Sequence, residues 1–497
     1  MRSPSTVALA VVLAASGCVA DEPPATVGIP GSGCTATVDV PEISPVSTGD
    51  PASLYADDAL ALFELELPGP TYGDMCEKAK AYADYLWDRD HRDDVPEVLQ
   101  QYSPADLVFQ GVRYPNVGVR FRGRTTIYAH FYDHDDPVPG ALDACRARRL
   151  AEKPSLKISL DAFGEEHEIA GQQTFDLIAR EGSDSEYLRE VLAQKLTREF
   201  GVEAPRSSHA RLCLDGEYEG LFSLIEEADT QRFLNQHFPG APDGDYWKVE
   251  SDGDQYWHER WDESGNWVGD YEPKAGTSPD QPGRLRDLLL LGSRIDEGAP
   301  TAEIQDGIDD LLNVEQWLRE IAVELSIPDY DGMFGNHKNH LLYDHPDGFR
   351  VVPFDRDIAF VDIVDYSAGR CPGDILGGHP CWASNRAGPS IAAWLVEHQE
   401  GAYLATVRAF VDDVYDADAL ASWIHARADA MRPWIVADRY YQPDSPACAA
   451  DADCDYFTVD GWEYAVRTTL VEDVAERVAA VRSQLDGTPT CSEPCGD

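Results

Sequence analysis

The sequence predicts an α+β fold built as a single large domain with disulfides. Alternating apolar and polar residues, typical of strands, occur at 117–123 and 156–160. Helical patterns with apolar faces occur at 183–200 and 313–325. The chain has 497 residues, of which 43% are hydrophobic, which is enough for a sizeable core. No linker-like break falls between 55 and 440, so we predict one domain rather than two.

The charge balance excludes one class of partner. The chain has 90 acidic and 40 basic residues, a formal net charge of -50. A surface this acidic repels phosphate backbones and anionic headgroups, so we expect no nucleic-acid partner. Eight of the basic residues are lysines, which makes each lysine a candidate for a specific role.

The N-terminus predicts export. Arg2 precedes a short apolar run, Val7–Ala15, which is too short to span a bilayer. Ala15-Ser-Gly-Cys18 then resembles a bacterial lipobox, with lipidation expected at Cys18. The alternative is an ordinary signal peptide cleaved nearby. We therefore predict a lipoprotein signal peptide over 1–18 and a flexible Pro-, Gly- and Ser-rich tether over 19–50.

The expected location follows from this leader. The protein would be exported and lipid-anchored to a bacterial membrane, periplasmic or at the cell surface, touching the membrane only through its anchor. An even number of cysteines remains after Cys18, which in an exported chain indicates up to five disulfides of unknown connectivity. These ten are Cys34, Cys76, Cys145, Cys213, Cys371, Cys381, Cys448, Cys454, Cys491 and Cys495.

The N-terminal half predicts strands with a few helices. We expect a strand over 59–67 and a short helix over 77–87. In the strand 156–160, Lys157 faces away from Ile158 because side chains alternate between the two faces of a strand. Ser183 and Glu186 form a capping box.

Turn and stop signals continue the pattern. Gly201 ends the helix that Ser183 opens. Asp215-Gly216 is a strong hairpin signal between 211–214 and 218–225. Residues 251–283 are polar, aromatic and Gly-rich, as in an irregular insertion.

The C-terminal half predicts a helix, a hairpin and further helices. Asn313 caps a helix that Pro328 ends. A hairpin is expected over 340–343 and 349–354, followed by helices over 390–436 and 462–485. The segment 441–497 comprises this C-terminal helix and a disulfide-bonded tail.

One stretch suggests chemistry. Asp331 lies in a loop after the predicted helix, Asn339 precedes the hairpin, and Asp355 follows it. Protein kinases place an Asp and an Asn in a loop and a metal-binding Asp after the next hairpin. Asn339 follows Asp331 at a spacing of eight positions, which exceeds the usual kinase spacing. By itself, an Asp after a strand is more often a turn residue or a helix cap.

A series of short blocks resembles the spore-coat CotH kinase family over residues 51–440. Asp331 to Tyr343 is similar to the family's "D…HN…lY", and Val352 to Asp357 is similar to "iPWDxD". The other similar blocks, in family order, are Val117–Gly123, Lys153–Lys157, Leu188–Glu190 with Ala204–Arg206, Gly216–Gly220 with Glu226–Asp229, and Tyr246–Lys248.

The resemblance implies an atypical protein-kinase-like fold that binds ATP with Mg²⁺ or Mn²⁺ and phosphorylates Ser or Thr of surface or coat proteins. Asp331 would be the catalytic Asp. Asn339 and Asp355 would be metal ligands, with Asp357 assisting.

The nucleotide contacts follow from the same resemblance. Lys157 would contact the phosphates with Glu226 as its partner, and Lys153 is the alternative to Lys157. Arg120 and Lys248 are further candidates. Each also has a structural interpretation: a solvated strand lysine for Lys157, a surface ion pair for Arg120, a polar strand end for Glu226, and packing over aromatic rings for Lys248.

The sequence departs from the family blocks at several positions. Arg122 replaces a lysine, Phe354 replaces the tryptophan, and a glycine common near the end of the last block is absent after Phe360. These differences keep a second hypothesis open, in which the protein is a catalytically inactive CotH-like lipoprotein that binds a polymer or a cation. Stacking on sugars would then involve Trp247, Trp257, Trp261 and Trp267.

Overall fold

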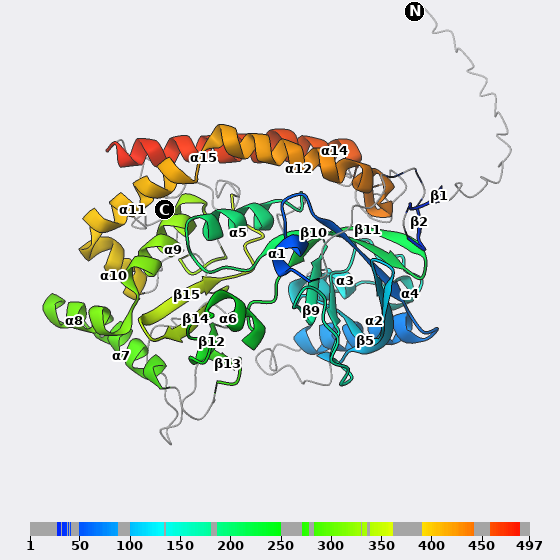
Figure 1. The fold of residues 1–497 in the computed structure, drawn as a ribbon, viewed down its shortest axis with the longest axis horizontal. Coiled ribbons are helices and arrows are strands. Elements are labelled where there is room, and N and C mark those ends of the chain that lie inside the picture. The colour runs from blue at the N-terminus through cyan, green and yellow to red at the C-terminus, as the bar shows by residue number, and fades with distance from the viewer. Residues whose placement is uncertain are drawn as a thin grey trace, which may run out of the picture.

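The computed structural model describes most of the chain. The described residues are 27–30, 32–36, 38, 40, 49–87, 100–133, 136–179, 186–249, 271–277, 283–329, 331–334, 338–360, 390–441 and 458–487. Helices and strands are mixed along this chain, as the sequence predicts. Its described residues build two larger sheets, a two-stranded ribbon and a layer of helices (Figure 1).

The larger sheet closes on itself. Its nine strands run in the order β1-β2-β11-β10-β3-β4-β5-β8-β9, and β9 also pairs with β11. Strand β3 is parallel to β10, whereas β10–β11, β4–β5, β5–β8 and β8–β9 are antiparallel. The strands are β1 (Val27–Gly28), β2 (Thr35–Ala36), β3 (Leu60–Glu66), β4 (Ser103–Phe109), β5 (Val112–Phe121), β8 (Leu156–Ser159), β9 (Thr174–Ile178), β10 (Ser207–Leu214) and β11 (Glu217–Ile225).

Alternation sets the two faces of this sheet. Val119, Ile158 and Phe175 are fully buried in one apolar cluster. The alternate positions Arg120, Lys157 and Asp176 occupy the opposite face, because side chains of successive strand residues point to opposite sides. This cluster also includes side chains of α2 (Thr71–Trp87).

The smaller sheet carries the predicted hairpin. Its order is β13-β12-β14-β15, formed by Tyr271–Lys274, Tyr246–Val249, His340–His345 and Gly348–Pro353. Strands β6 (Tyr132–Asp133) and β7 (Asp136–Pro137) form a separate two-stranded antiparallel ribbon. The remaining helices before β14 are α1 (Pro51–Leu54), α3 (Thr125–Phe131), α4 (Ala141–Arg146), α5 (Arg189–Glu199), α6 (Gln231–His237), α7 (Arg284–Asp296), α8 (Thr301–Leu311) and α9 (Val314–Ser326).

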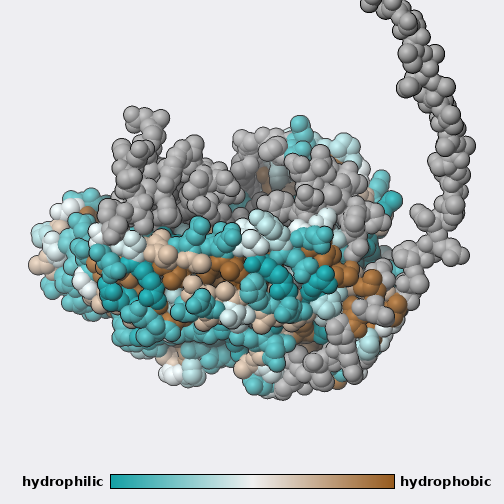
Figure 2. Space-filling model, turned by 90° about the horizontal axis from the view of Figure 1, so that it is seen from above, coloured by the Kyte–Doolittle hydropathy of each residue, from teal (hydrophilic) through white to brown (hydrophobic). Residues whose placement is uncertain are grey.

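A layer of C-terminal helices covers one side of the molecule. In Figure 1, α12 lies alongside α14 and α15 across the top of both sheets. This face is mostly hydrophilic, with apolar side chains in patches along its middle (Figure 2). The elements are α10 (Ser390–His398), α11 (Glu400–Asp413), α12 (Ala417–Ala437), a 3₁₀ turn at Arg439–Tyr441, α14 (Val459–Tyr464), a π-helical turn at Ala465–Thr469, and α15 (Leu470–Leu485).

Local sequence signals have mixed outcomes. The hairpin turn forms at Asp215 and Gly216, whose φ angles are 52° and 84°. Asn313 caps α9, because its side chain accepts a hydrogen bond from the Gln316 amide at 3.0 Å. The predicted helix start is wrong: α5 begins at Arg189 without a side-chain cap, and Glu186 pairs with Arg189. The predicted cap residue, Ser183, lies outside the described residues.

Two disulfides lie in the described part of the chain. Cys34 is bonded to Cys213, and Cys76 is bonded to Cys145. The other predicted disulfide cysteines, the leader with Cys18 and most of the tether lie outside the described residues. No helix among the described residues is both long enough and apolar enough to cross a membrane.

Candidate active site

The hairpin β14–β15 brings three predicted site residues together. Asn339 immediately precedes β14 and Asp355 lies two residues past β15, so antiparallel pairing places them side by side. The amide nitrogen of Phe354 donates to the Asn339 carbonyl at 3.0 Å. Asn339 Nδ2 donates to Asp331 Oδ2 at 3.2 Å and to the Asp355 carbonyl at 3.3 Å. One amide group therefore joins all three.

The backbone has an unusual conformation where the chain enters β14 and again shortly after it leaves β15. Asn339 and Asp355 have φ angles of 58° and 56°, in the left-handed region that Asn and Asp tolerate better than most residues. The Asn339 side chain contacts Asp331 of the preceding loop and the backbone carbonyl of Asp355. Asp357 follows two residues later and is half-buried.

A lysine that the sequence analysis missed also reaches this site. Lys338 Nζ lies 2.8 Å from Asp331 Oδ2. Its neighbour Asn339 contacts the same oxygen. Two features of the sequence could have identified Lys338: lysine is scarce in this chain, and Lys338 directly precedes Asn339.

A buried charged cluster packs beside the loop that carries Asp331. Arg356 donates to Glu320 and, at 2.7 Å, to Thr197 Oγ1, and its Nε lies 3.6 Å from Asp329 Oδ2. Glu324 accepts a hydrogen bond from the Phe334 amide at 2.6 Å, which fixes the end of the loop that carries the catalytic candidate.

Burial governs the protonation of these acids. It raises the pKa of Asp329 to about 7, with Arg356 opposing this shift. Burial also raises the pKa of Glu324 well above its usual range, and the neighbouring Glu320 adds to the effect. One guanidinium cannot neutralise three buried carboxylates, so the cluster retains protons at mildly acidic pH.

A second group of charges centres on Lys157. In the strand register, Lys157 pairs with Arg120 on β5 and with Asp176 on β9. Its ammonium forms an ion pair with Glu227 and lies 4.0 Å from Asp176 Oδ1. Arg122 Nε lies 3.1 Å from the other oxygen of Asp176. Strand alternation at 174–178 could have identified Asp176 from the sequence.

The partner predicted for Lys157 requires a correction. Glu226 accepts hydrogen bonds from Arg206 and lies 3.0 Å from His237 Nε2, so it anchors the segment after β11. Burial would raise the pKa of Glu226, but His237 and Arg206 outweigh it and lower this pKa to about 2. The acid that reaches Lys157 is the next residue, Glu227.

Lys153, the predicted alternative to Lys157, is held in a buried ion pair. Its Nζ lies 2.5 Å from Asp438 Oδ2 and donates to the Leu221 carbonyl at 2.6 Å. The lysine is 3% exposed and lies over the rings of Phe222 and Tyr187. It fixes the end of α12 to β11, which leaves its charge no access to a phosphate.

Lys248 links the two groups of charges. Its Nζ lies 5.2 Å from the centre of the Phe354 ring, next to Asp355 in the chain. Burial would raise the pKa of Asp229, but Lys274, Lys157 and Lys248 outweigh it and hold this pKa below its usual range. Lysines from both sheets therefore act on one carboxylate.

Arg120 has a different environment from Lys157. Its guanidinium lies 5.4 Å from the Tyr102 ring centre, and Nη1 donates to the Phe121 carbonyl at 3.1 Å. Arg120 lies opposite Lys157 in the strand register. Unlike Lys157, it forms no ion pair with an acidic side chain of the described residues. The position suits a second phosphate contact.

The donor set fits a phosphate-bound divalent cation. Within the described residues, no group of three His, Cys, Asp or Glu side chains is placed to hold a metal ion alone. Mg²⁺ in phosphoryl-transfer sites needs only one or two carboxylates, because substrate phosphates and water complete its shell. Asn339 uses its nitrogen for hydrogen bonds, so its oxygen is a candidate ligand together with the carboxylates of Asp355 and Asp357.

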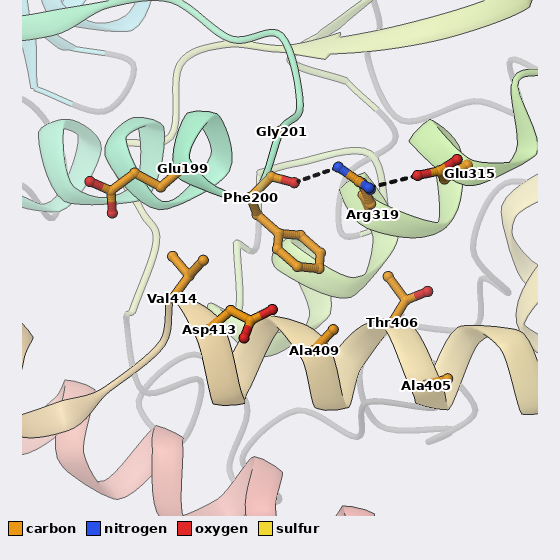
Figure 3. Close-up of a pocket in the computed structure, with 10 residues that line it drawn as sticks. All are labelled: Glu199, Phe200, Gly201, Glu315, Arg319, Ala405, Thr406, Ala409, Asp413 and Val414. Atoms are coloured by element: carbon orange, nitrogen blue, oxygen red, sulfur yellow. Dashed lines mark hydrogen bonds and ion pairs between the residues drawn. The ribbon is translucent and has the colours of Figure 1, made fainter.

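Two other regions do not contribute to this site. A surface pocket of about 480 Å³ between α5, α9 and α11 contains none of the predicted site residues (Figure 3). In that pocket Arg319 contacts Glu315 and the Phe200 carbonyl. Trp247 is 1% exposed and packs in the core, and the other three tryptophans proposed to stack on sugars lie outside the described residues.

Comparison with known proteins agrees with the block pattern. The chain is 22% identical over 345 residues to inner spore coat protein H of Bacillus subtilis (strain 168), which covers 65% of this chain and 88% of that protein. A family model described as CotH kinase protein matches residues 119–432, more than half of the chain. The protein therefore belongs to the CotH kinase protein family.

Proposed function

We propose that this protein is an exported protein kinase with an atypical kinase-like fold that transfers the γ-phosphate of ATP to Ser or Thr of surface or coat proteins. The observation that carries the proposal is the junction at Asn339, whose side chain contacts both Asp331 and Asp355. A carboxylate to receive a proton and oxygen ligands for a cation are what phosphoryl transfer requires in one place.

The proposed reaction assigns each group a role. The acceptor hydroxyl oxygen attacks the γ-phosphorus, and Asp331 receives the hydroxyl proton. The bond from the γ-phosphorus to the bridging oxygen breaks, and its electron pair leaves with ADP. Bound Mg²⁺ or Mn²⁺ would neutralise phosphate charge, held by Asn339 and Asp355 with help from Asp357. Lys157 and Arg120 would hold the phosphates.

The proposed location has separate support. Disulfides form and persist mainly in oxidising compartments, and the described residues contain two. The similar Bacillus protein is named as a spore coat protein. With the leader over 1–18, these observations favour export, with lipidation at Cys18 and a kinase-like domain over 51–440 followed by the tail over 441–497.

The test is a phosphoryl-transfer assay on exported, oxidised protein with ATP, Mg²⁺ or Mn²⁺, and a Ser-rich acceptor. Mass spectrometry would detect added phosphate in the wild type and in Asp355→Ala. Asp74→Ala removes an exposed carboxylate from α2 and serves as the matched control. Phosphate that appears in wild type and control but not in Asp355→Ala supports the proposal. Nucleotide binding without transfer would favour the inactive binding module instead.

A further inference from the structure

We propose that Lys338 is a further catalytic residue, whose ammonium contacts the phosphoryl group during transfer. The inference rests on the proposed function and deepens it. It starts from the ion pair between Lys338 and Asp331, at 2.8 Å, which no part of the sequence pattern assigned.

The backbone holds Lys338 in place on both sides. Its amide nitrogen donates to the Gly332 carbonyl at 3.4 Å, and its own carbonyl lies 3.1 Å from His340 Nδ1. The side chain is 34% exposed. A fixed backbone with a partly exposed ammonium lets the charge move between nearby acceptors while staying at the site.

The position of the ammonium follows from the role of Asp331. A carboxylate that receives the acceptor proton must lie within hydrogen-bond reach of the attacking oxygen, which in turn lies about 3 Å from the γ-phosphorus. Lys338 Nζ is 2.8 Å from Oδ2 of that carboxylate. In that arrangement the ammonium would lie close to the γ-phosphate oxygens.

The other lysines of the site are held by more acidic surroundings. Lys157 pairs with Glu227 and approaches Asp176, whereas Lys274 pairs with Asp229 and Glu272. Those contacts suit charges that remain in place. Lys338 instead shares its partner with the reacting hydroxyl, so it is positioned where negative charge accumulates on the equatorial phosphate oxygens.

The proposed step conserves atoms and charge. The acceptor oxygen forms a bond to the γ-phosphorus as the bond to the bridging oxygen breaks, and ADP leaves with the electron pair. Asp331 takes the hydroxyl proton. Lys338 stays protonated and donates a hydrogen bond to an equatorial oxygen, so it transfers no proton.

Kinetics of substituted proteins distinguish this role from that of an ordinary ion pair. We expect Lys338→Ala to lower kcat about 100-fold, as loss of one donor to a transition-state charge does, with a much smaller change in the KM for ATP. Lys338→Arg keeps the charge and should retain more activity. Lys80→Ala removes a lysine from an i,i+4 pair on α2 and should leave kcat unchanged.

A second readout does not depend on phosphoryl transfer. An acyl phosphate of ATP acylates lysines that lie near its terminal phosphate, and peptide mass spectrometry identifies them. We expect acylation of Lys338 that excess ATP prevents, and none at Lys80.

The outcomes separate the two proposals. If the wild type transfers phosphate but Lys338→Ala keeps its kcat, or if Lys157 is acylated and Lys338 is not, the inference is wrong and the proposed function stands. If the wild type transfers no phosphate, the proposed function fails, and acylation still decides whether Lys338 lies beside the terminal phosphate. Absence of both phosphoryl transfer and acylation at every lysine overturns both.

Discussion

The side chain of Asn339 spans two carboxylate-bearing segments, with its nitrogen 3.2 Å from Asp331 Oδ2 and 3.3 Å from the Asp355 carbonyl. Both contacts use the amide as a donor. A carboxylate of the same shape would offer no donor and would repel Asp331. The amide therefore determines whether the loop and the end of the hairpin can remain together.

Replacing this amide should abolish phosphoryl transfer while the fold persists. Asn339→Asp keeps a residue that tolerates the left-handed φ of 58°, so it isolates the effect of the donor. We expect kcat to fall at least about 100-fold with a thermal midpoint close to that of the wild type. Activity within a few-fold of wild type would show that the junction has no catalytic role.

Substitution of Glu226 should mainly change stability, whereas substitution of the adjacent Glu227 should mainly change ATP affinity. Glu226→Gln removes the charge that Arg206 and His237 surround, which should lower the free energy of unfolding by about 3 kcal/mol. Glu227→Gln leaves that anchor intact and removes the closer of the two acids beside Lys157, so it should change ATP affinity more than stability.

Chemical denaturation and ATP titration of both variants would check this assignment. The reverse pattern, in which Glu226→Gln changes ATP affinity and Glu227→Gln changes mainly stability, would restore the partner predicted from the sequence.

Stability should fall as pH rises through the acidic range. The pKa of Asp329 is about 7 in the folded protein, against an ordinary value of 3.8, so the folded state binds the extra proton between these values. This stabilisation is fully present below about pH 4 and lost by about pH 7, amounting to at most about 4 kcal/mol. Glu226, with its lowered pKa, acts in the opposite direction only below about pH 4.5.

The measurement is denaturant unfolding at pH 5 and pH 7.5, for wild type and Asp329→Asn. The free energy of unfolding of the wild type should decrease between these values, and the decrease should be smaller in the variant. An equal decrease in both proteins would assign the effect to other groups, of which Glu320 and Glu324 are the nearest buried acids.

The buried pair of Lys153 and Asp438 should matter for stability alone. Lys153→Met leaves the Asp438 carboxylate buried without its cation and should cost about 3 to 5 kcal/mol in unfolding free energy. The double variant Lys153→Met with Asp438→Leu removes both charges and should recover part of this loss. Loss of ATP binding in a folded Lys153 variant would contradict the structural role.

The sequence by itself determined the local elements of this protein. Alternation predicted β5 and β8 with Lys157 opposite Ile158, and Asp215-Gly216 predicted the hairpin turn, because these features depend only on neighbouring residues. It also predicted the order of Asp331, Asn339 and Asp355 around a second hairpin, and antiparallel pairing then makes two of them neighbours.

Only the tertiary structure decided how the charges pair. Lys153 and Lys157 belong to the same short sequence block. Lys153 is nevertheless buried against Asp438, 285 residues away, whereas Lys157 pairs with Glu227. Likewise, Lys338 pairs with Asp331 where its own amide bonds to the Gly332 carbonyl, next to Asp331 in the chain. A long side chain pairs with whichever acid the packing brings within about 4 Å, and that distance is set by the whole fold and not by spacing along the chain.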